Sequence, residues 1–318
     1  MTDRPINATG GIAAASTSMS DAVSALPQEA SVSDFVALLK PRVMSLVVFT
    51  GFAGMMIAPG SIHPVIAAVA ILCIAIATGA SGAINMWYER DLDAKMERTK
   101  DRPLPAGRME PEPALAFGCI LAGGSVMVMG LGVNWAAAAL LALAIGFYVF
   151  VYTIWLKRRT PQNIVIGGAA GAFPPLIGWA AVTGDISLGG IALFALIFMW
   201  TPPHFWALAL YKCEDYEKAG VPMLPVVSGV LETKKQILLY TVLLLPVSLI
   251  PTWIGTASLA WGALSAALGV VFIGFAVKVW FDETDRAPRQ MFRYSLLYLS
   301  VLFAGLIVDN LVGRMLVG

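Results

Sequence analysis

Two carboxylates and one amide recur at four-residue spacing near the end of a long apolar stretch. They are Asn85, Glu89 and Asp93, and in a helix such positions lie along one stripe. Carboxylate and amide oxygens suit a hard dication that holds a phosphorylated substrate, and the cation would relieve the repulsion between the acids. The spacing therefore indicates a site for Mg²⁺ and a diphosphate. The simpler alternative is a charged helix end at a membrane boundary; Asp91 lies off the stripe.

Cations crowd the segment that directly follows the stripe. They are Lys95, Arg98, Lys100, Arg102 and Arg108. A diphosphate needs metal ions to bridge its oxygens and basic side chains to neutralise the remaining charge, and Arg suits bidentate phosphate contacts. This composition favours the diphosphate interpretation, although some of these cations can serve only to fix the membrane topology.

A second polar cluster runs from Tyr211 to Pro222 and contains the adjacent acids Glu214 and Asp215. If this cluster faces the first across one cavity, the two would clamp an allylic diphosphate through Mg²⁺. The metal would turn the diphosphate into a good leaving group. Taken alone, the second cluster can equally be a solvated loop.

The sequence contains two histidines, which have different surroundings. His204 follows the pair Pro202-Pro203 inside an apolar stretch, where the prolines free backbone carbonyls and kink a helix around a cavity. An ionisable side chain inside a span is costly, so His204 is a candidate for contact with haem or another substrate. The alternative is a neutral histidine that bonds to a neighbouring helix. His63 lies in a short turn and is either a boundary residue or an external haem contact.

Membrane-spanning helices are the elements that must position these residues. Of the 318 residues, 58% are hydrophobic and 13% are charged, and the mean hydropathy is +0.78. This composition leaves too little polar surface to cover a soluble globule. The net charge of +1 shows no basic excess for nucleic acid, and the three cysteines have no metal-ligand spacing. The chain is therefore predicted to be an all-α polytopic membrane protein.

Nine apolar stretches are long enough to cross a bilayer, and they begin near residues 43, 64, 113, 135, 163, 187, 236, 259 and 291. Every Lys and Arg except Arg314 lies in the N-terminal tail or after the second, fourth, sixth and eighth stretches. The positive-inside bias therefore places these segments and the N-terminus in the cytoplasm, and the C-terminus outside. Residues 1–34 are predicted to be a disordered cytoplasmic tail, and residues 35–318 the integral-membrane domain.

Several segments resemble the UbiA superfamily of intramembrane prenyltransferases, and within it the branch that acts on haem. The resemblance rests on Leu39 to Val43, Asn85 to Gly107, Lys157 to Pro175, Trp200 to Trp206 and Tyr211 to Val227. The superfamily's first motif usually reads Asn-Asp-x-x-Asp-x-x-x-Asp, and here Met86 and Glu89 replace its first two acids. Where quinone-type relatives carry Asp-x-x-x-Asp, this chain has Lys212 and Tyr216, as in the haem branch.

The resemblance implies a bundle of nine transmembrane helices around a central cavity that opens to the cytoplasmic side. It also implies an enzyme of the bacterial inner membrane that transfers the farnesyl group of farnesyl diphosphate to the C2 vinyl group of haem B. Water addition then gives haem O for the biogenesis of haem-copper oxidases. Mg²⁺ is the implied cofactor, and the pathway suggests haem A synthase as the partner that receives the product.

The resemblance and the residue patterns together assign a role to each candidate residue. The catalytic set is Asn85, Glu89, Asp93, Glu214 and Asp215, of which all except Glu214 are expected to bind the metal. The residues expected to bind the diphosphate are Lys40, Arg42, Arg98, Arg102, Lys157, Arg158 and Lys212. His204 and His63 are expected to contact haem. A quinone-type aromatic prenyltransferase and a membrane transporter are the competing interpretations.

Overall fold

The structure is a computed structural model that describes residues 30–317, without the side chains of Arg42, Val43 and Val317. Within that range the chain forms helices and no strand. Most of the predicted tail, residues 1–29, lies outside the described residues, but its last residues enter helix α2 (Val32–Leu38). Ser31 begins this helix through a capping box with Asp34, which satisfies backbone donors at the helix start.

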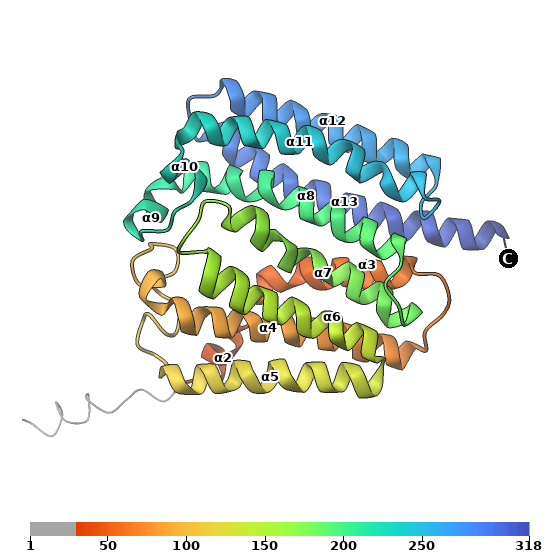
Figure 1. Cartoon of the computed structure of the whole chain (residues 1–318), viewed down its shortest axis with the longest axis horizontal. Helices are drawn as coiled ribbons and strands as arrows, with labels where there is room; N and C mark the ends of the chain where they lie inside the picture. The colour runs from red at the N-terminus through yellow and green to blue at the C-terminus, as the bar shows by residue number, and fades with distance from the viewer. Residues whose placement is uncertain (1–29, 318) are drawn as a thin grey trace, which may run out of the picture.

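Long helices lie side by side along the long axis of the molecule (Figure 1). After α2 they are α3 (Pro41–Ile57), α4 (Pro64–Asp93), α5 (Pro111–Gly132), α6 (Trp135–Gly146) with η1 (Phe147–Leu156), α7 (Asn163–Thr183) and α8 (Leu188–Tyr211). Two short helices, α9 (Cys213–Lys218) and α10 (Leu224–Val227), lie at one end of the bundle. The chain then continues through α11 (Gly229–Trp253), α12 (Leu259–Phe281) and α13 (Arg286–Val317).

Eight of these helices are long and apolar enough to cross a membrane, counting α6 and η1 as one span from Trp135 to Leu156. They correspond to eight of the nine predicted stretches, so the prediction of an all-helical, multi-pass membrane protein is confirmed. The first stretch forms α3, whose apolar part, Met44–Ile57, is shorter than a full span. The count of nine spans and the side on which a central cavity opens stay predictions.

Close contact between α3 and α7 places α3 in the middle of the bundle (Figure 1). A Cβ atom at Gly54 would overlap the carbonyl of Pro175, and one at Gly178 would overlap the carbonyl of Gly51. Small residues allow helix backbones to approach in this way, and in a bilayer such packing drives helix association. The two glycines therefore fix the distance between α3 and α7.

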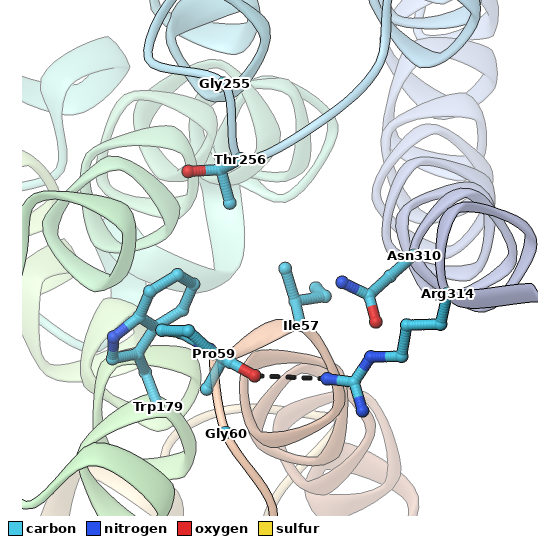
Figure 2. A pocket seen from close by; sticks show the side chains of 9 residues that line it. Ile57, Pro59, Gly60, Trp179, Gly255, Thr256, Asn310 and Arg314 are labelled. Carbon is cyan, nitrogen blue, oxygen red and sulfur yellow. Dashed lines mark hydrogen bonds between the residues drawn. The ribbon is translucent and has the colours of Figure 1, made fainter. Parts of the chain in front are cut away.

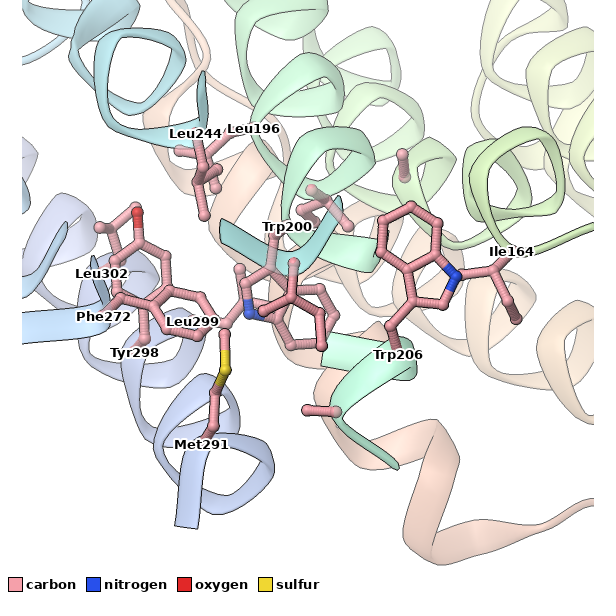
Figure 3. Packing of buried hydrophobic residues seen from close by; sticks show 14 of the residues in the cluster. Ile164, Leu196, Trp200, Trp206, Leu244, Phe272, Met291, Tyr298, Leu299 and Leu302 are labelled. Carbon is pink, nitrogen blue, oxygen red and sulfur yellow. The ribbon is translucent and has the colours of Figure 1, made fainter. Parts of the chain in front are cut away.

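Large buried side chains fill the space between α8 and the last three helices (Figure 3). Phe272 of α12 and Tyr298 of α13 lie with ring centroids 5.2 Å apart, and both are fully buried. Trp200 of α8 donates a hydrogen bond from its indole nitrogen to the carbonyl of Ser295 at 2.9 Å. This bond satisfies the one polar group of a buried tryptophan and sets the position of α8 against α13.

The segment that begins as α6 changes from α-helix to π-helix at Phe147 and remains π-helical to Leu156. A π-helix is rare, and it is frequently found at functional sites. Here it ends beside the stripe on α4, with Thr153 buried and Lys157 directly after the helix. The π-helix and the residue after it thus supply Thr153 and Lys157 to the candidate site.

Candidate active site

The predicted stripe lies on the last three turns of α4, inside the protein. Asn85, Glu89 and Asp93 are each no more than 3% exposed. A charged helix end in solvent would leave the two acids accessible, so the simpler alternative does not describe their surroundings. Buried carboxylates need compensating partners, because burial without them is very costly.

Each of the three residues is held by a different cation. Lys40 Nζ, at the start of α3, donates to Asn85 Oδ1 at 2.9 Å, and Arg102 Nη1 donates to Asp93 Oδ2 at 2.7 Å. Lys157, after η1, forms an ion pair with Glu89 Oε2. Three segments that are distant in sequence therefore place three cations around two carboxylates and one amide.

Lys40 occupies an unusual backbone position at this site. Its φ of 53° lies in the left-handed region, where a residue with a side chain pays a conformational cost. Burial and then the nearby Arg102 charge lower the pKa of Lys40 to about 7. When Lys40 is protonated, three cations face two carboxylates, and the site then has the charge balance to accept an anionic ligand.

Thr153 completes the hydrogen bonding of Asn85. The Asn85 Nδ2 atom donates to Thr153 Oγ1 at 3.1 Å, so the amide oxygen of Asn85 faces Lys40. In contrast, Glu89 Oε1 is buried and has no hydrogen-bond partner among the described residues. An unpaired carboxylate oxygen in the interior is costly, and its presence at this position marks a place for a further ligand.

The donor atoms of the stripe fit a Mg²⁺ ion. Mg²⁺ prefers carboxylate and carbonyl oxygens, and it is usually held by one or two carboxylates and completed by water and substrate phosphates. Within residues 30–317, no group of three or more His, Cys, Asp and Glu side chains is close enough to hold a metal. The protein thus offers one amide and two carboxylates, one of which contains the unpaired Glu89 Oε1 atom, and a substrate would supply the other ligands.

The second acidic cluster does not contact the stripe directly. On α9, Glu214 lies 3.8 Å from Lys218 and is largely exposed, whereas Asp215 is half-buried and lies 3.4 Å from Lys212. Across the described chain, no hydrogen bond or ion pair joins either acid to the stripe. Tyr216 instead connects α9 to the loop that follows α4. Its buried ring lies under Arg98, with the guanidinium carbon 5.9 Å from the ring centroid.

The other predicted diphosphate ligands have separate positions. Arg158 donates two hydrogen bonds, of 2.9 and 2.7 Å, to the off-stripe acid Asp91, and its guanidinium lies over the Tyr88 ring. This arrangement makes Arg158 a partner of Asp91 at the edge of the site. The side chain of Arg42 lies outside the described residues.

The two predicted haem contacts lie in different places: His63 directly precedes α4, and His204 lies inside the second half of α8. His63 caps the start of α4, where its Nδ1 accepts from Val65 N at 3.3 Å. His204 is buried between the rings of Trp200 and Phe292, with ring centroids 4.3 and 4.6 Å away. His204 Nδ1 lies 2.6 Å from Ser295 Oγ. The structure therefore gives His63 a capping role and does not bring the two histidines together.

A cavity of about 530 Å³ lies at the opposite end of the bundle from the stripe, beside the turn after α3 (Figure 2). Ile57, Trp179, Asn310 and Arg314 are among its lining residues. Arg314 donates to the carbonyl oxygens of Met56 and Ala58 at 3.3 and 3.2 Å, which satisfies the C-terminal end of α3. None of the predicted site residues lines this cavity.

Comparison with known proteins identifies the family. The model of the UbiA prenyltransferase family matches residues 47–302, which include the stripe, η1, His204 and α9. The chain belongs to the UbiA prenyltransferase family. It is therefore a prenyltransferase of the membrane, as the sequence resemblance predicts.

Relatives within the UbiA family are similar along nearly the whole chain. The chain is 59% identical to a protohaem IX farnesyltransferase of Parvibaculum lavamentivorans, over 89% of this chain and 90% of the relative. It is also 59% identical to a protein of the same name from Granulibacter bethesdensis, over 90% of this chain and 93% of the relative.

Solved structures of UbiA proteins share the fold at low sequence identity. A digeranylgeranylglyceryl phosphate synthase structure matches with a TM-score of 0.74 and 18% identity, over 88% of this chain and 98% of that one. A UbiA homologue from Archaeoglobus fulgidus bound to DMAPP and Mg²⁺ matches with a TM-score of 0.64 and 16% identity, over 86% and 99%. These likenesses support the helical architecture alone.

Three polar residues of this UbiA protein were not predicted from its sequence. Thr153 bonds to Asn85, Ser295 bonds to His204, and Asn163 is fully buried with no partner for its Oδ1 atom in the part of the chain described. Single hydroxyls inside apolar spans give no pattern that separates them from ordinary helix residues. Asn163 had a usable signal, because a buried amide at a helix start is costly unless it has a partner.

Proposed function

We propose that this protein is a Mg²⁺-dependent protohaem IX farnesyltransferase, which joins the farnesyl group of farnesyl diphosphate to the C2 vinyl group of haem B. Water addition gives haem O, and diphosphate is the other product. The observation that carries the proposal is the buried stripe of Asn85, Glu89 and Asp93 surrounded by Lys40, Arg102 and Lys157. The names of the relatives at 59% identity supply the acceptor.

The cations at the stripe have a role before and after substrate binds. In their present contacts they neutralise the stripe, which keeps two buried carboxylates at acceptable cost. When a diphosphate enters, the same ammonium and guanidinium groups can donate to its oxygens, because Lys and Arg both bind phosphate strongly. Mg²⁺ on Asn85, Glu89 and Asp93 would neutralise diphosphate charge and so favour departure of the leaving group.

The cations also stabilise charge as the allylic C–O bond breaks. Negative charge grows on the departing diphosphate, and fixed donors such as Lys157 and Arg102 are aimed at that region before the reaction begins. Asp215 and Glu214 are proposed as helpers from the second cluster, with Lys212, Arg98, Arg158 and Arg42 at the outer part of the diphosphate site. These residues are expected to stabilise the charge on the departing diphosphate less than the stripe and its three cations do.

His204 is proposed as a haem contact, and its hydrogen bond assigns the available nitrogen. The Ser295 hydroxyl donates to the Phe292 carbonyl at 2.7 Å, so it can only accept from His204 Nδ1. His204 Nδ1 therefore carries the proton and Nε2 keeps its lone pair, which is the form in which imidazole binds haem iron. For His63 we propose only a contact with haem at the external side, which would compete with the hydrogen bond from Val65 N to His63 Nδ1.

The proposed setting is the bacterial inner membrane, with the N-terminus in the cytoplasm and the C-terminus outside. The distribution of Lys and Arg supports this orientation. It places the stripe at the cytoplasmic side, where both water-soluble diphosphate and Mg²⁺ are available. Haem A synthase is proposed as the protein that receives the product.

The test uses purified protein with farnesyl diphosphate, haem B and increasing Mg²⁺, followed by mass analysis of the extracted haem. Haem O should form only when Mg²⁺ is present. Glu89→Gln should lower the rate by about 100-fold or more, because it removes one charged ligand and preserves side-chain size. Glu97→Gln is the matched control, since Glu97 is exposed and pairs with Lys100. Prenylation of an aromatic acid with no conversion of haem would overturn the proposal.

A further inference from the structure

We propose that a groove between α12 and α13 binds one anionic phospholipid. The groove has a volume of about 520 Å³ and is lined by Phe275, Lys278, Gln290, Arg293, Tyr294 and Leu297. It lies at the same end of the bundle as α9 and α10, where α12 turns into α13. The site is separate from the stripe on α4, and none of its lining residues belongs to the predicted active site.

Two cations in this groove have no carboxylate partner. Lys278 Nζ donates to Gln290 Oε1 at 2.8 Å, and neither Lys278 nor Arg293 forms an ion pair with any described residue. The acids of the adjoining turn are engaged elsewhere: Asp282 accepts from Thr284 and Ala287, and Asp285 pairs with Arg289. Glu283 is exposed and does not line the groove.

Lys278 and Arg293 are thus free to pair with an anionic ligand, since no described carboxylate lies within ion-pair distance of either side chain. Basic pockets between helices at the cytoplasmic end of membrane proteins bind anionic headgroups, because both the lipid phosphate and the low-dielectric surroundings strengthen the attraction. A zwitterionic headgroup would bring a cation of its own next to Lys278 and Arg293, whereas an anionic headgroup brings only negative charge. The pair of cations therefore favours a lipid with net negative charge.

Apolar side chains continue the groove toward the middle of the span. Phe275 lies one helical turn from Lys278, and Leu297 lies one turn from Arg293, both on the side away from the α12–α13 turn. Phe275 and Tyr294 stack with ring centroids 4.8 Å apart, and Tyr294 is fixed by a hydrogen bond of 2.8 Å to the Leu268 carbonyl. Cations above an apolar channel match the order of headgroup and acyl chain in a bilayer leaflet.

Both helices that form the groove face the surrounding membrane. Most of the apolar windows of α12 and α13 are not covered by other parts of the protein. A phospholipid can therefore enter the groove sideways from the bilayer, without crossing protein. This access distinguishes the groove from the stripe on α4, whose polar groups are buried.

The experiment measures retained lipid by native mass spectrometry of the full chain, after exchange into micelles with equal phosphatidylglycerol and phosphatidylcholine. The unaltered protein should retain one phosphatidylglycerol in preference to phosphatidylcholine. The double variant Lys278→Ala with Arg293→Ala should weaken that binding about 25-fold. Each cation near an anionic headgroup raises the affinity about fivefold, and the two effects multiply. Leu297→Trp should also weaken it, because it fills the apolar part and keeps both charges.

The matched control removes two exposed cations outside the groove, Lys100→Ala with Lys235→Ala, and changes the net charge equally. Both lysines pair with a glutamate three residues away, and the control should retain phosphatidylglycerol like the unaltered protein. Equal losses in the two double variants would overturn the proposal, and so would equal retention of the two lipids. Displacement of the lipid by farnesyl diphosphate or inorganic phosphate at micromolar concentration would also overturn it, by assigning the groove to those anions.

Discussion

Lys157 binds one oxygen of Glu89, and the other oxygen is buried with no partner among the described residues. The carboxylate is therefore neutralised by the protein on one side and open to a ligand on the other. An unpaired buried acceptor destabilises the fold, and a ligand at this oxygen would relieve that cost. Glu89 therefore affects the stability of the folded protein, and it is also the stripe residue best placed to bind a metal ion.

Removing Lys157 should destabilise the protein more than removing both charges of the pair. Lys157→Met leaves Glu89 as an uncompensated buried charge, with an expected cost of about 3–5 kcal/mol. The double variant Lys157→Met with Glu89→Gln should recover a large part of this loss, because no buried charge remains. Unfolding of the detergent-solubilised single and double variants measures the difference. If the double variant is the less stable of the two, Lys157 does not compensate Glu89.

Thr153→Val should weaken Mg²⁺ binding while it preserves side-chain shape. The substitution leaves Asn85 Nδ2 without its acceptor, which should cost about 1–3 kcal/mol and free the amide to rotate. The expected readout is a higher Mg²⁺ concentration at half-maximal rate. Thr241→Val is the matched control, because Thr241 is also buried and its hydroxyl bonds only to a carbonyl of its own helix. Identical Mg²⁺ dependence in the two variants would exclude a positioning role for Thr153.

Gly178→Ala should destabilise the contact between α3 and α7. The added methyl group would overlap the Gly51 carbonyl, and forcing the two backbones apart should cost about 1–3 kcal/mol. Gly171→Ala on the same helix is the control, because a Cβ atom there meets no neighbour within 4 Å. Thermal unfolding of both variants tests the contact, and equal midpoints would show that the approach of the helices is not tight.

Acid should release α2 from the loop after α4. The Ser31 hydroxyl and then Arg108 hold the pKa of Asp34 below its ordinary value of 3.8. The stabilisation from the ionised carboxylate is fully present above 3.8 and is lost as the pH falls through the lower folded pKa. Cleavage within α2 by an acid protease should rise across that range. In Asp34→Asn, cleavage should already be high at the upper end of the range and change little with pH.

The sequence predicted the elements that follow from periodicity and composition. Apolar length located the spans to within a few residues for most helices, and four-residue spacing placed Asn85, Glu89 and Asp93 on one buried stripe. The cations near the stripe were also predicted as a group. These features depend on residues close in sequence, so they are visible without the fold.

Contacts between distant residues were not visible in the sequence. Thr153 meets Asn85 across 68 positions, and Ser295 meets His204 across 91. The π-helix was also unforeseen, because an apolar run such as Phe147–Leu156 is compatible with either helix type. The bonds of Arg158 to Asp91, off the stripe, were also not predicted, because they join residues 67 positions apart.

Arg314 joins the end of α13 to the end of α3, so the last helix of the chain completes the environment of the first. During synthesis, α3 is made long before α13, so its C-terminal carbonyls receive the Arg314 guanidinium only after the rest of the bundle has been made. The stripe and its cations are all encoded before residue 160. The order of synthesis therefore makes the stripe and its three cations available before the second acidic cluster and the last helix have been added.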